Sequence, residues 1–437
     1  MTSERPLTSV TDRPLPDPGD AASVNDVGVP WHNGSTMPTT PETASTPDTS
    51  TAAVPGHPTG GTHPSAAFRR LTGSLGALPQ GHPLRAAGTL DAPLLQALTG
   101  RAPGRRPVWF MRQAGRSLPE YRSLRQGTAM LDACLDPAMA AEITLQPVRR
   151  HDVDAAIFFS DIVVPMRVAG VDVEIVPGRG PVLERPVRTA ADVAALPELT
   201  EGSLDPIREA VARTVAELGA TPLIGFAGAP FTVAAYMVEG GPSRDHLLPR
   251  TMMHADPAAW RALAEWAART SGAFLRAQVE AGASAVQLFD SWAGSLSLAD
   301  YSAHVVEHSA AALRAVEDLA VPRIHFGTGT GELLAAMRDA GADAVGVDYR
   351  IPLAEANRRL GGSTVLQGNI DPALLTAPWP VLAEHVREVL AGGATAPGHV
   401  VNLGHGVPPG TDPQVLTDLV SFVHDQPLEQ TPRGGRP

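Results

Sequence analysis

The chain has 437 residues, of which 43% are hydrophobic and 18% charged, and it carries a formal net charge of −12. This length and composition predict a globular protein with one large domain or two ordinary ones, and no apolar run approaches the roughly 20 residues that cross a bilayer. The acidic balance argues against general nucleic-acid binding, because phosphate neutralisation requires a basic surface.

Residues 1–85 are rich in Thr, Ser, Pro, Gly and Asp and contain few large apolar side chains. Such a segment cannot bury enough apolar surface to offset its ordering entropy, so we expect a disordered tail. A dispensable extension is favoured over a regulatory or partner-binding tail, and a weakly amphipathic patch from Ala67 to Leu78 is expected to lie against the folded body. The N-terminus lacks the pattern of a secretory signal or a transit peptide, which predicts a cytoplasmic location.

From Asp91 onward, short β-prone runs alternate with alanine-rich helical patterns. The expected strands are Pro107 to Met111, Ala155 to Ser160, Leu223 to Ala227, Ala285 to Asp290, Arg323 to Gly327, Ala344 to Asp348, Thr364 to Gly368 and His399 to Leu403. The expected helices are Met139 to Arg149, Asp205 to Leu218, Pro257 to Ala281, Tyr301 to Leu319, Thr330 to Ala340, Pro352 to Leu360 and Pro378 to Ala391.

Apolar strands that alternate with helices predict a parallel sheet covered by helices, and eight such units predict one closed α/β barrel of the (β/α)8 TIM type. We expect it to occupy residues 86–426, with a flexible tail at 427–437. A doubly wound open sheet is the alternative. However, no GxGxxG motif follows the first expected strand, and the glycines at 327–331 come too late to be one.

In a TIM-type barrel the active site collects where the strands end, so polar residues are expected directly after the apolar runs. These positions hold Arg112, Asp161, Asp290 with Ser291, Asp348 with Tyr349, Asn369 with Asp371, and His405. Loops are polar in any protein, so the pattern favours the architecture more than any single residue.

The loop after the first expected strand holds two arginines four residues apart, Arg112 and Arg116. Gly115 lets the backbone bend between them, and Pro119 keeps the loop from joining a helix. Two guanidiniums on one loop suit the binding of carboxylates or phosphates. The alternatives are a surface turn with two solvated arginines, or an ion pair of Arg116 with Glu120.

Five segments carry a resemblance to a known family. They are PVWFMRQAGR followed by LPEYR, FSDIVVP, GFAGAPFTVAAYMVEGG, GNIDP and NLGHGVPP, which begin at Pro107, Phe159, Gly225, Gly368 and Asn402. In this order they resemble the motifs of the uroporphyrinogen decarboxylase family. The resemblance covers the chain from about Asp91 to about His424 and does not reach the N-terminal tail.

The resemblance implies a carboxy-lyase that removes the four acetate carboxyls of uroporphyrinogen III, giving coproporphyrinogen III and carbon dioxide in porphyrin and heme biosynthesis. It implies that Arg112 and Arg116 bind substrate carboxylates and that Asp161 binds pyrrole N–H groups. The other substrate-binding positions that it implies are Gln113, Ala114, Gly115, Tyr236, Ser291 and His405. Helix N-capping is the alternative role for Asp161, and ordinary hydrogen bonding is the alternative for Tyr236 and Ser291.

The composition also limits the chemistry. The chain has no lysine, which excludes a lysine Schiff base with pyridoxal phosphate and a P-loop, and Cys134 is the single cysteine, read as a buried thiol. The resemblance implies catalysis without cofactor or metal, in which the protonated pyrrole accepts the electrons and Asp161 stabilises the cationic intermediate. The proton donor could be Arg112, Tyr236, His405 or a bound water. The expected catalytic residues are therefore Asp161, Arg112, Tyr236 and His405.

Two positions depart from the family pattern. Ser117 stands where an aromatic residue is common, and Trp292 where a histidine is frequent, which concerns local packing or affinity more than activity. Two other functions compete: a zinc-dependent methyltransferase of the related barrel group, which needs cysteine ligands that a lone Cys134 cannot supply, and a noncatalytic tetrapyrrole carrier. The resemblance further implies that the protein is a homodimer and that its small-molecule ligand is the substrate uroporphyrinogen. It implies no nucleic-acid partner and no membrane association.

Overall fold

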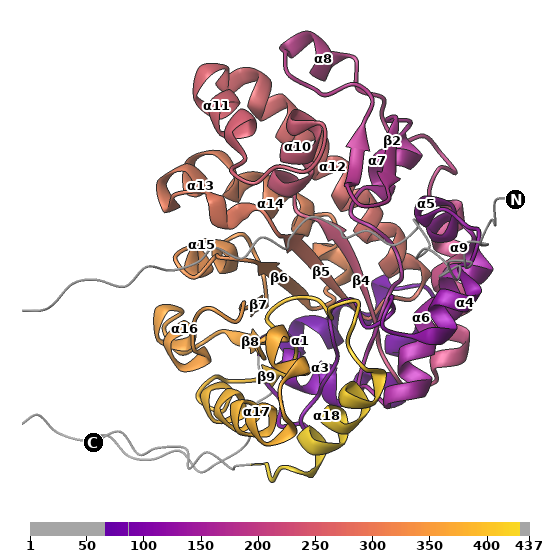
Figure 1. The fold of residues 1–437 in the computed structure, drawn as a ribbon, viewed down its shortest axis with the longest axis vertical. Coiled ribbons are helices and arrows are strands. Elements are labelled where there is room, and N and C mark those ends of the chain that lie inside the picture. The colour runs from indigo at the N-terminus through magenta and orange to yellow at the C-terminus, as the bar shows by residue number, and fades with distance from the viewer. Residues whose placement is uncertain (1–65, 86, 429–437) are drawn as a thin grey trace, which may run out of the picture.

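The computed structural model describes residues 66–85 and 87–428. Its centre is a parallel sheet of seven strands in the order β1-β4-β5-β6-β7-β8-β9, with helices packed around it (Figure 1). These strands are β1 (Ala156–Ile157), β4 (Leu223–Gly228), β5 (Ala285–Asp290), β6 (Arg323–Gly327), β7 (Ala344–Gly346), β8 (Val365–Gln367) and β9 (His399–Val400). Neighbours in the sheet follow one another along the chain with helices between them, which confirms the predicted TIM-type α/β class.

The segment that was expected to be the first strand lies between β9 and β1. Val108 forms a parallel bridge with Val401. The Val401 N–H donates to the Pro107 carbonyl at 2.8 Å, and the Trp109 N–H donates to the Val401 carbonyl at 3.2 Å. On the other side, the Asp154 N–H donates to the Val108 carbonyl at 2.8 Å. The segment thus fills the eighth position of the barrel, although it makes too few ladder bonds to be a regular strand.

The helices that were expected from the sequence are present. Two match the expected ranges, α9 (Asp205–Leu218) and α12 (Pro257–Ala281). The others are α6 (Pro137–His151), α15 (Leu334–Asp339), α16 (Leu353–Arg359) and α17 (Trp379–Gly393). The expected helix from Tyr301 to Leu319 is divided into α13 (Leu298–His304), α14 (Val306–Arg314) and the turn η4 (Glu317–Leu319), because the backbone at Val305 leaves helical geometry.

Two of the longest helices, α6 and α12, begin at Asp-Pro pairs. The Asp136 carboxylate accepts hydrogen bonds from the N–H groups of Ala138 and Met139 at the start of α6, and the Asp256 carboxylate accepts one from Ala259 at the start of α12. An aspartate cap satisfies N–H groups that have no partner within the helix, and proline at the first helical position loses no hydrogen bond.

Several elements were not expected. A hairpin of β2 (Val173–Val176) and β3 (Gly180–Leu183) is separate from the barrel sheet. The additional helices are α2 (Ala87–Leu90), α3 (Pro93–Leu98), α4 (Pro119–Leu124), α5 (Met130–Leu135), α7 (Val164–Ala169), α8 (Ala190–Ala194), α10 (Pro230–Glu239), α11 (Leu247–Ala255) and α18 (Pro413–Asp425), and the short turns are η3 (Ala293–Ser295) and η5 (Pro372–Thr376). Most are short, and α10 is hydrophobic all round, so helical periodicity is weak in it.

The N-terminal segment before residue 86 is partly described. Residues 66–85 form α1 (Ala66–Gly73) and the turns η1 (Leu75–Ala77) and η2 (Pro83–Arg85), and Leu71, Leu78 and Leu84 are buried in the main hydrophobic core. The patch from Ala67 to Leu78 therefore lies against the body, as expected, and packing begins before the expected boundary at 85. The rest of the expected tail, residues 1–65, and the C-terminal residues 429–437 lie outside the described residues.

Candidate active site

The arginine loop leaves the barrel at Met111. Arg112 has a left-handed backbone (φ 60°), an unfavourable conformation for a residue with a side chain, and it is exposed to solvent. A Cβ on Gly115 would lie 3.0 Å from the Arg112 carbonyl oxygen, so the glycine permits this turn. The Gln113 side chain is fully buried, accepts from the Phe110 N–H at 3.0 Å and donates to the Ala155 carbonyl at 3.1 Å. The Gln113 side chain therefore fixes the loop to the barrel.

Asp161 follows β1 and is half-buried. One of its carboxylate oxygens accepts a hydrogen bond from the Val163 N–H at 3.1 Å. Burial raises the pKa of Asp161, while the backbone N–H of Val163 and the Arg112 guanidinium act in the opposite direction. The electrostatic influence of Arg112 places these two site residues in one region of the molecule.

His405 lies on the loop after β9 and is half-buried. Burial, together with the charges of Arg112 and Arg350, lowers the pKa of His405 to about 4. A Cβ on Gly406 would lie 2.4 Å from Cδ of Arg112, and one on Gly404 would lie 2.2 Å from the Tyr349 nitrogen. The two glycines beside His405 let this loop pack against the arginine loop and the residues after β7.

Tyr236 is buried near the end of α10, and its ring stacks on Trp292 with 3.8 Å between the ring centroids. Burial raises the pKa of the Tyr236 phenol well above its ordinary value, and the Asp161 carboxylate adds to this shift while Arg112 opposes it. Trp292 also contacts the ring of His246, with 4.2 Å between centroids. The departure at Trp292 thus touches a predicted site residue, which the sequence did not indicate.

Beneath these rings lies a buried polar cluster. The Thr232 hydroxyl on α10 donates to the Asp290 carboxylate at 2.7 Å, and the Trp292 N–H donates to the same hydroxyl at 3.3 Å. His325 Nε2 lies 3.5 Å from the other Asp290 oxygen, and Asp290 and His325 are both fully buried. Asp290 was noted as a polar strand end, and in the structure its hydrogen bond with Thr232 joins α10 to the end of β5.

For the remaining predicted positions, Arg116, Ala114 and Ser291, the structure shows fewer contacts with the other predicted site residues. Arg116 is half-buried and lies near Tyr121, whose raised pKa it slightly opposes. Glu120, the alternative partner of Arg116, instead forms a bidentate pair with Arg150 at 2.6 and 2.7 Å. Ala114 and Ser291 are half-buried, and the Ser291 carbonyl accepts a hydrogen bond from Thr328. The Ser117 hydroxyl is buried without a hydrogen-bond partner.

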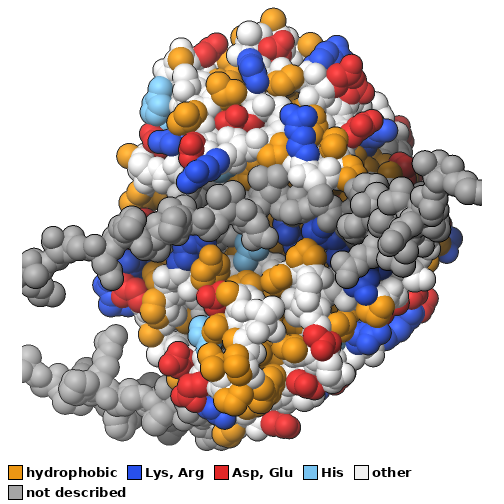
Figure 2. Space-filling view, viewed as in Figure 1, with side chains coloured by type: hydrophobic (Ala, Val, Ile, Leu, Met, Phe, Trp, Pro, Cys, Tyr) orange, Lys and Arg blue, Asp and Glu red, His pale blue; other side chains and the backbone are white. Residues whose placement is uncertain are grey.

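Arg350 was not singled out from the sequence. It follows Asp348 and Tyr349 at the end of β7, pairs with the Asp348 carboxylate, and lies over the Tyr349 ring at 4.6 Å. Its charge reaches His405, as the lowered pKa of that histidine shows. In Figure 2 arginine side chains show across the middle of the face, between α10 and α11 on one side and α16 and α18 on the other.

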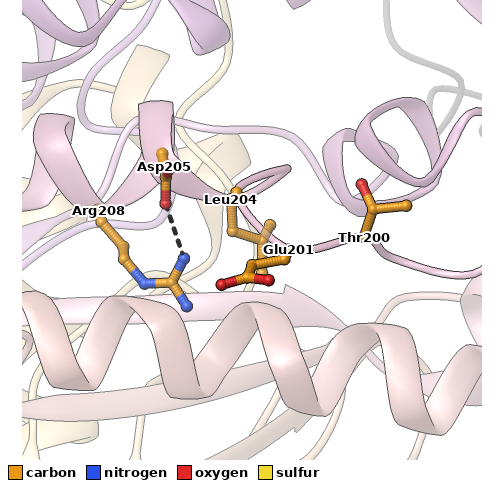
Figure 3. A pocket seen from close by; sticks show the side chains of 6 residues that line it. Thr200, Glu201, Leu204, Asp205 and Arg208 are labelled. Carbon is orange, nitrogen blue, oxygen red and sulfur yellow. Dashed lines mark hydrogen bonds and ion pairs between the residues drawn. The ribbon is translucent and has the colours of Figure 1, made fainter.

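Other hollows and donor clusters lie away from these residues. Figure 3 shows a surface hollow of about 410 Å³ at the start of α9, where Arg208 pairs with Asp205 at 3.2 Å. It is lined by loop and helix residues and by none of the predicted site residues. Within the described part of the chain, one group of side chains has metal-ligand spacing, His254, Asp300 and His304. Cys134 is buried, as expected, and burial raises its pKa well above the ordinary value.

Comparison with known proteins agrees with the resemblance in the motifs. The family model described as uroporphyrinogen decarboxylase (URO-D) matches residues 89–426. The chain belongs to this family. A uroporphyrinogen decarboxylase of Arthrobacter sp. (strain FB24) is 73% identical over 336 residues, which are 77% of this chain and 97% of the relative. One of Leifsonia xyli subsp. xyli is 62% identical over 369 residues, covering 80% of this chain and 98% of the relative.

The family assignment identifies the chain as a carboxy-lyase, as the motifs predicted. Among solved structures, a methyltransferase from Methanosarcina mazei superposes with a TM-score of 0.64 at 19% identity, covering 77% of this chain and 98% of that one. At this identity the likeness concerns the fold alone. Within residues 66–85 and 87–428, none of the helices has the length and apolar character required to span a bilayer.

Proposed function

We propose that this member of the uroporphyrinogen decarboxylase family converts uroporphyrinogen III into coproporphyrinogen III by removing its four acetate carboxyl groups as carbon dioxide. The observation that carries the proposal is the convergence on Arg112. This one guanidinium influences the pKa of Asp161, Tyr236 and His405, which come from three different segments of the chain. Convergence of loops at the carboxyl ends of barrel strands is how active sites are built in this architecture.

The arginines would bind the carboxylates of the substrate. An octacarboxylate must enter a protein of net charge −12, so the attraction has to come from local cations. Arg112 is exposed and Arg116 is half-buried on one loop, and Arg350 adds a third guanidinium near His405. Guanidinium groups bind carboxylates in a bidentate, geometrically specific way. Gly115 and Ala114 contribute to binding through the shape of the loop.

Asp161 would accept hydrogen bonds from the inward-pointing pyrrole N–H groups. Its raised pKa reflects burial that the Val163 N–H and Arg112 offset only in part, so further donors would stabilise its ionised form. Protonation of a pyrrole α-carbon makes that ring an electron acceptor, and loss of carbon dioxide from the adjacent acetate returns the electrons to it and leaves an exocyclic methylene. A second proton converts this methylene to the methyl group, and loss of the proton from the α-carbon restores the pyrrole. We propose that the Asp161 carboxylate stabilises this cationic ring electrostatically.

The pKa shifts of His405 and Tyr236 reduce the number of candidates for the proton donor. A pKa of about 4 means that His405 is neutral near pH 7 in the free protein, so it acts first as a hydrogen-bonding group. Tyr236 keeps its proton, because burial and Asp161 raise its pKa. We propose that Tyr236 and Ser291 orient the substrate and that a water held near Arg112 delivers the proton, with His405 as the alternative.

The experiment is incubation of the full chain with uroporphyrinogen III under anaerobic conditions, followed by oxidation and separation of the porphyrins by carboxyl number. A decarboxylase gives seven- to four-carboxyl products, with the four-carboxyl product accumulating. A carrier returns only the eight-carboxyl porphyrin, and that result, obtained with folded protein, would overturn the proposal.

Four further properties are proposed with it. We expect catalysis without a cofactor or metal, so dialysis against EDTA should leave the rate unchanged. We expect a homodimer, which light scattering on the full chain would show, and a cytoplasmic location. The N-terminal residues 1–65 are proposed to be dispensable for turnover.

A further inference from the structure

A cluster of two histidines and one aspartate joins α11 to α13. His254 lies near the end of α11, and Asp300 and His304 lie one helical turn apart on α13. His254 Nε2 is 3.4 Å from an Asp300 carboxylate oxygen, and the rings of His254 and His304 meet edge to face with centroids 5.6 Å apart. One ligand atom from each of the three lies within 4.8 Å of the other two.

We propose that His254, Asp300 and His304 bind one Zn²⁺ ion, which links α11 to α13. Zinc bonds to histidine nitrogen and carboxylate oxygen are about 2.0–2.2 Å long, so tetrahedral ligands lie roughly 3.4 Å apart. The His254 to Asp300 separation already has this value. Two imidazoles and a carboxylate favour zinc over magnesium, which prefers oxygen ligands only.

The helix ends add to the attraction. His304 is the last residue of α13, and His254 is next to last in α11, so both imidazoles lie at helix C-termini. The dipole of a helix makes its C-terminal end favourable for a cation. His254 is exposed while Asp300 and His304 are half-buried, which leaves an open side for entry and for a water ligand.

A plain surface ion pair is the competing explanation. A His254–Asp300 pair alone would not require His304, and exposed pairs contribute little to stability. The backbone at His304 is fixed independently of this pair, because its carbonyl accepts a hydrogen bond from the Trp260 indole on α12 at 3.1 Å. The His304 ring extends from this fixed backbone to the ring of His254, with 5.6 Å between the centroids, so a third nitrogen ligand lies beside the pair.

The site would act on structure and not on the decarboxylation. Helix α11 follows His246, whose ring lies on Trp292, and α13 begins shortly after Trp292 in the chain. A bound ion would join the far ends of these two segments. We expect it to stabilise the fold, because a ligand that binds only the native state shifts the unfolding equilibrium.

The test is zinc titration of the untagged, EDTA-treated full chain by calorimetry, with thermal unfolding measured in parallel. The variants are His254→Gln and His304→Gln, and the matched control is Thr251→Ala, an exposed position on the same helix α11. We expect each histidine variant to bind at this site at least about tenfold more weakly, since even loss of outer partners costs that much in metal sites. Zinc should raise the unfolding temperature of the wild type and the control only.

Histidines 32, 57 and 63 lie outside the described residues and are unchanged in all variants, so their zinc binding cancels in the comparison. Magnesium at the same concentration should have no effect. Equal zinc affinity, stoichiometry and temperature shift in the wild type and both histidine variants would overturn the proposal, and so would a wild type that binds no zinc. Neither result bears on the decarboxylase assay.

Discussion

The ionised form of Asp161, which the proposed reaction requires, lowers the stability of the fold. Its folded pKa is raised, because burial penalises the carboxylate more than its neighbours stabilise it. A raised folded pKa means that the native state holds its proton to higher pH than the unfolded chain. The contribution of this group to the unfolding free energy therefore falls as pH rises through that range. Ionisation of Asp161 therefore opposes folding, which is expected where a charge serves a ligand.

Replacing Asp161 with Asn separates these two effects. The amide oxygen can still accept the Val163 N–H, so the local turn is kept. We expect turnover of uroporphyrinogen to fall by about 10²–10³-fold, the usual loss for one electrostatic group, while the unfolding temperature at pH 7 is unchanged or higher. The measurements are the porphyrin product assay and thermal unfolding. A variant that keeps turnover would remove Asp161 from the mechanism.

His405 makes a prediction about pH. Because burial and the charges of Arg112 and Arg350 lower its pKa to about 4, its titration in the free protein lies below the neutral range. The profile of kcat/KM, which reports the free enzyme, should then have the same shape in wild type and His405→Gln between about pH 5.5 and 8. A limb near the ordinary histidine pKa of about 6.5 that disappears in the variant would contradict this and favour histidine as the proton donor.

The loops at the strand ends depend on one another. The segment Gly404–Gly406 passes so close to Arg112 that a Cβ on Gly406 would lie 2.4 Å from Cδ of the arginine. The position of the guanidinium is thus set by a loop from the opposite end of the chain. The rings of Tyr236 and Trp292 are set in the same way by the Thr232–Asp290 bond between α10 and β5.

A methyl group at Gly406 should therefore disturb Arg112. We expect Gly406→Ala to lower kcat/KM by about tenfold to a hundredfold, because an error of about 1 Å in a positioning group can cost this much. The control is Gly410→Ala, where the added Cβ meets nothing within 4 Å. Steady-state kinetics with uroporphyrinogen measure both. Equal kcat/KM in the two variants, with both folded, would show that the contact does not position Arg112.

The regular elements were largely predictable because their signals are local. Helices α9 and α12 and strands β5 and β6 match the expected ranges, since apolar periodicity and their end residues define them. The helix expected from Tyr301 to Leu319 is interrupted at Val305, where no proline or glycine marks the break. The β2–β3 hairpin was missed. Its last residue, Leu183, donates to the carbonyl of Gly240 just after α10, a contact that depends on tertiary packing.

The titratable residues of the candidate site could be proposed from the sequence, but the side chains around them could not. Arg112, Asp161 and His405 follow apolar runs directly, so both the barrel rule and the motifs indicate them. The buried role of Gln113 depends on Ala155, and the stacking of His246 on Trp292 joins residues far apart in the chain. Such pairings depend on how the chain folds back, which a single sequence does not show.

At the scale of the molecule, the segment around Val108 closes the barrel with few ladder hydrogen bonds. The N-terminal segment, residues 66–85, packs against the outside of the barrel. Leu71, Leu78 and Leu84 are almost completely buried in the main core, and Arg70 pairs with Asp343 beside β7. The Phe68 ring lies 4.1 Å from the Arg101 guanidinium. This segment is therefore part of the folded body even though its composition resembles that of the residues before it.

Two truncations test where the folded body begins. Removal of residues 1–65 should leave the unfolding temperature and the product assay unchanged. Removal of residues 1–85 also strips three buried leucines, and at about 1.5–3 kcal/mol for each buried side chain the unfolding free energy should fall by on the order of 5 kcal/mol. Denaturant titration of both proteins beside the full chain measures the difference. If removal of residues 1–85 leaves the unfolding free energy unchanged, the segment from 66 to 85 does not contribute to the core, and the boundary belongs at 85 as the composition suggested.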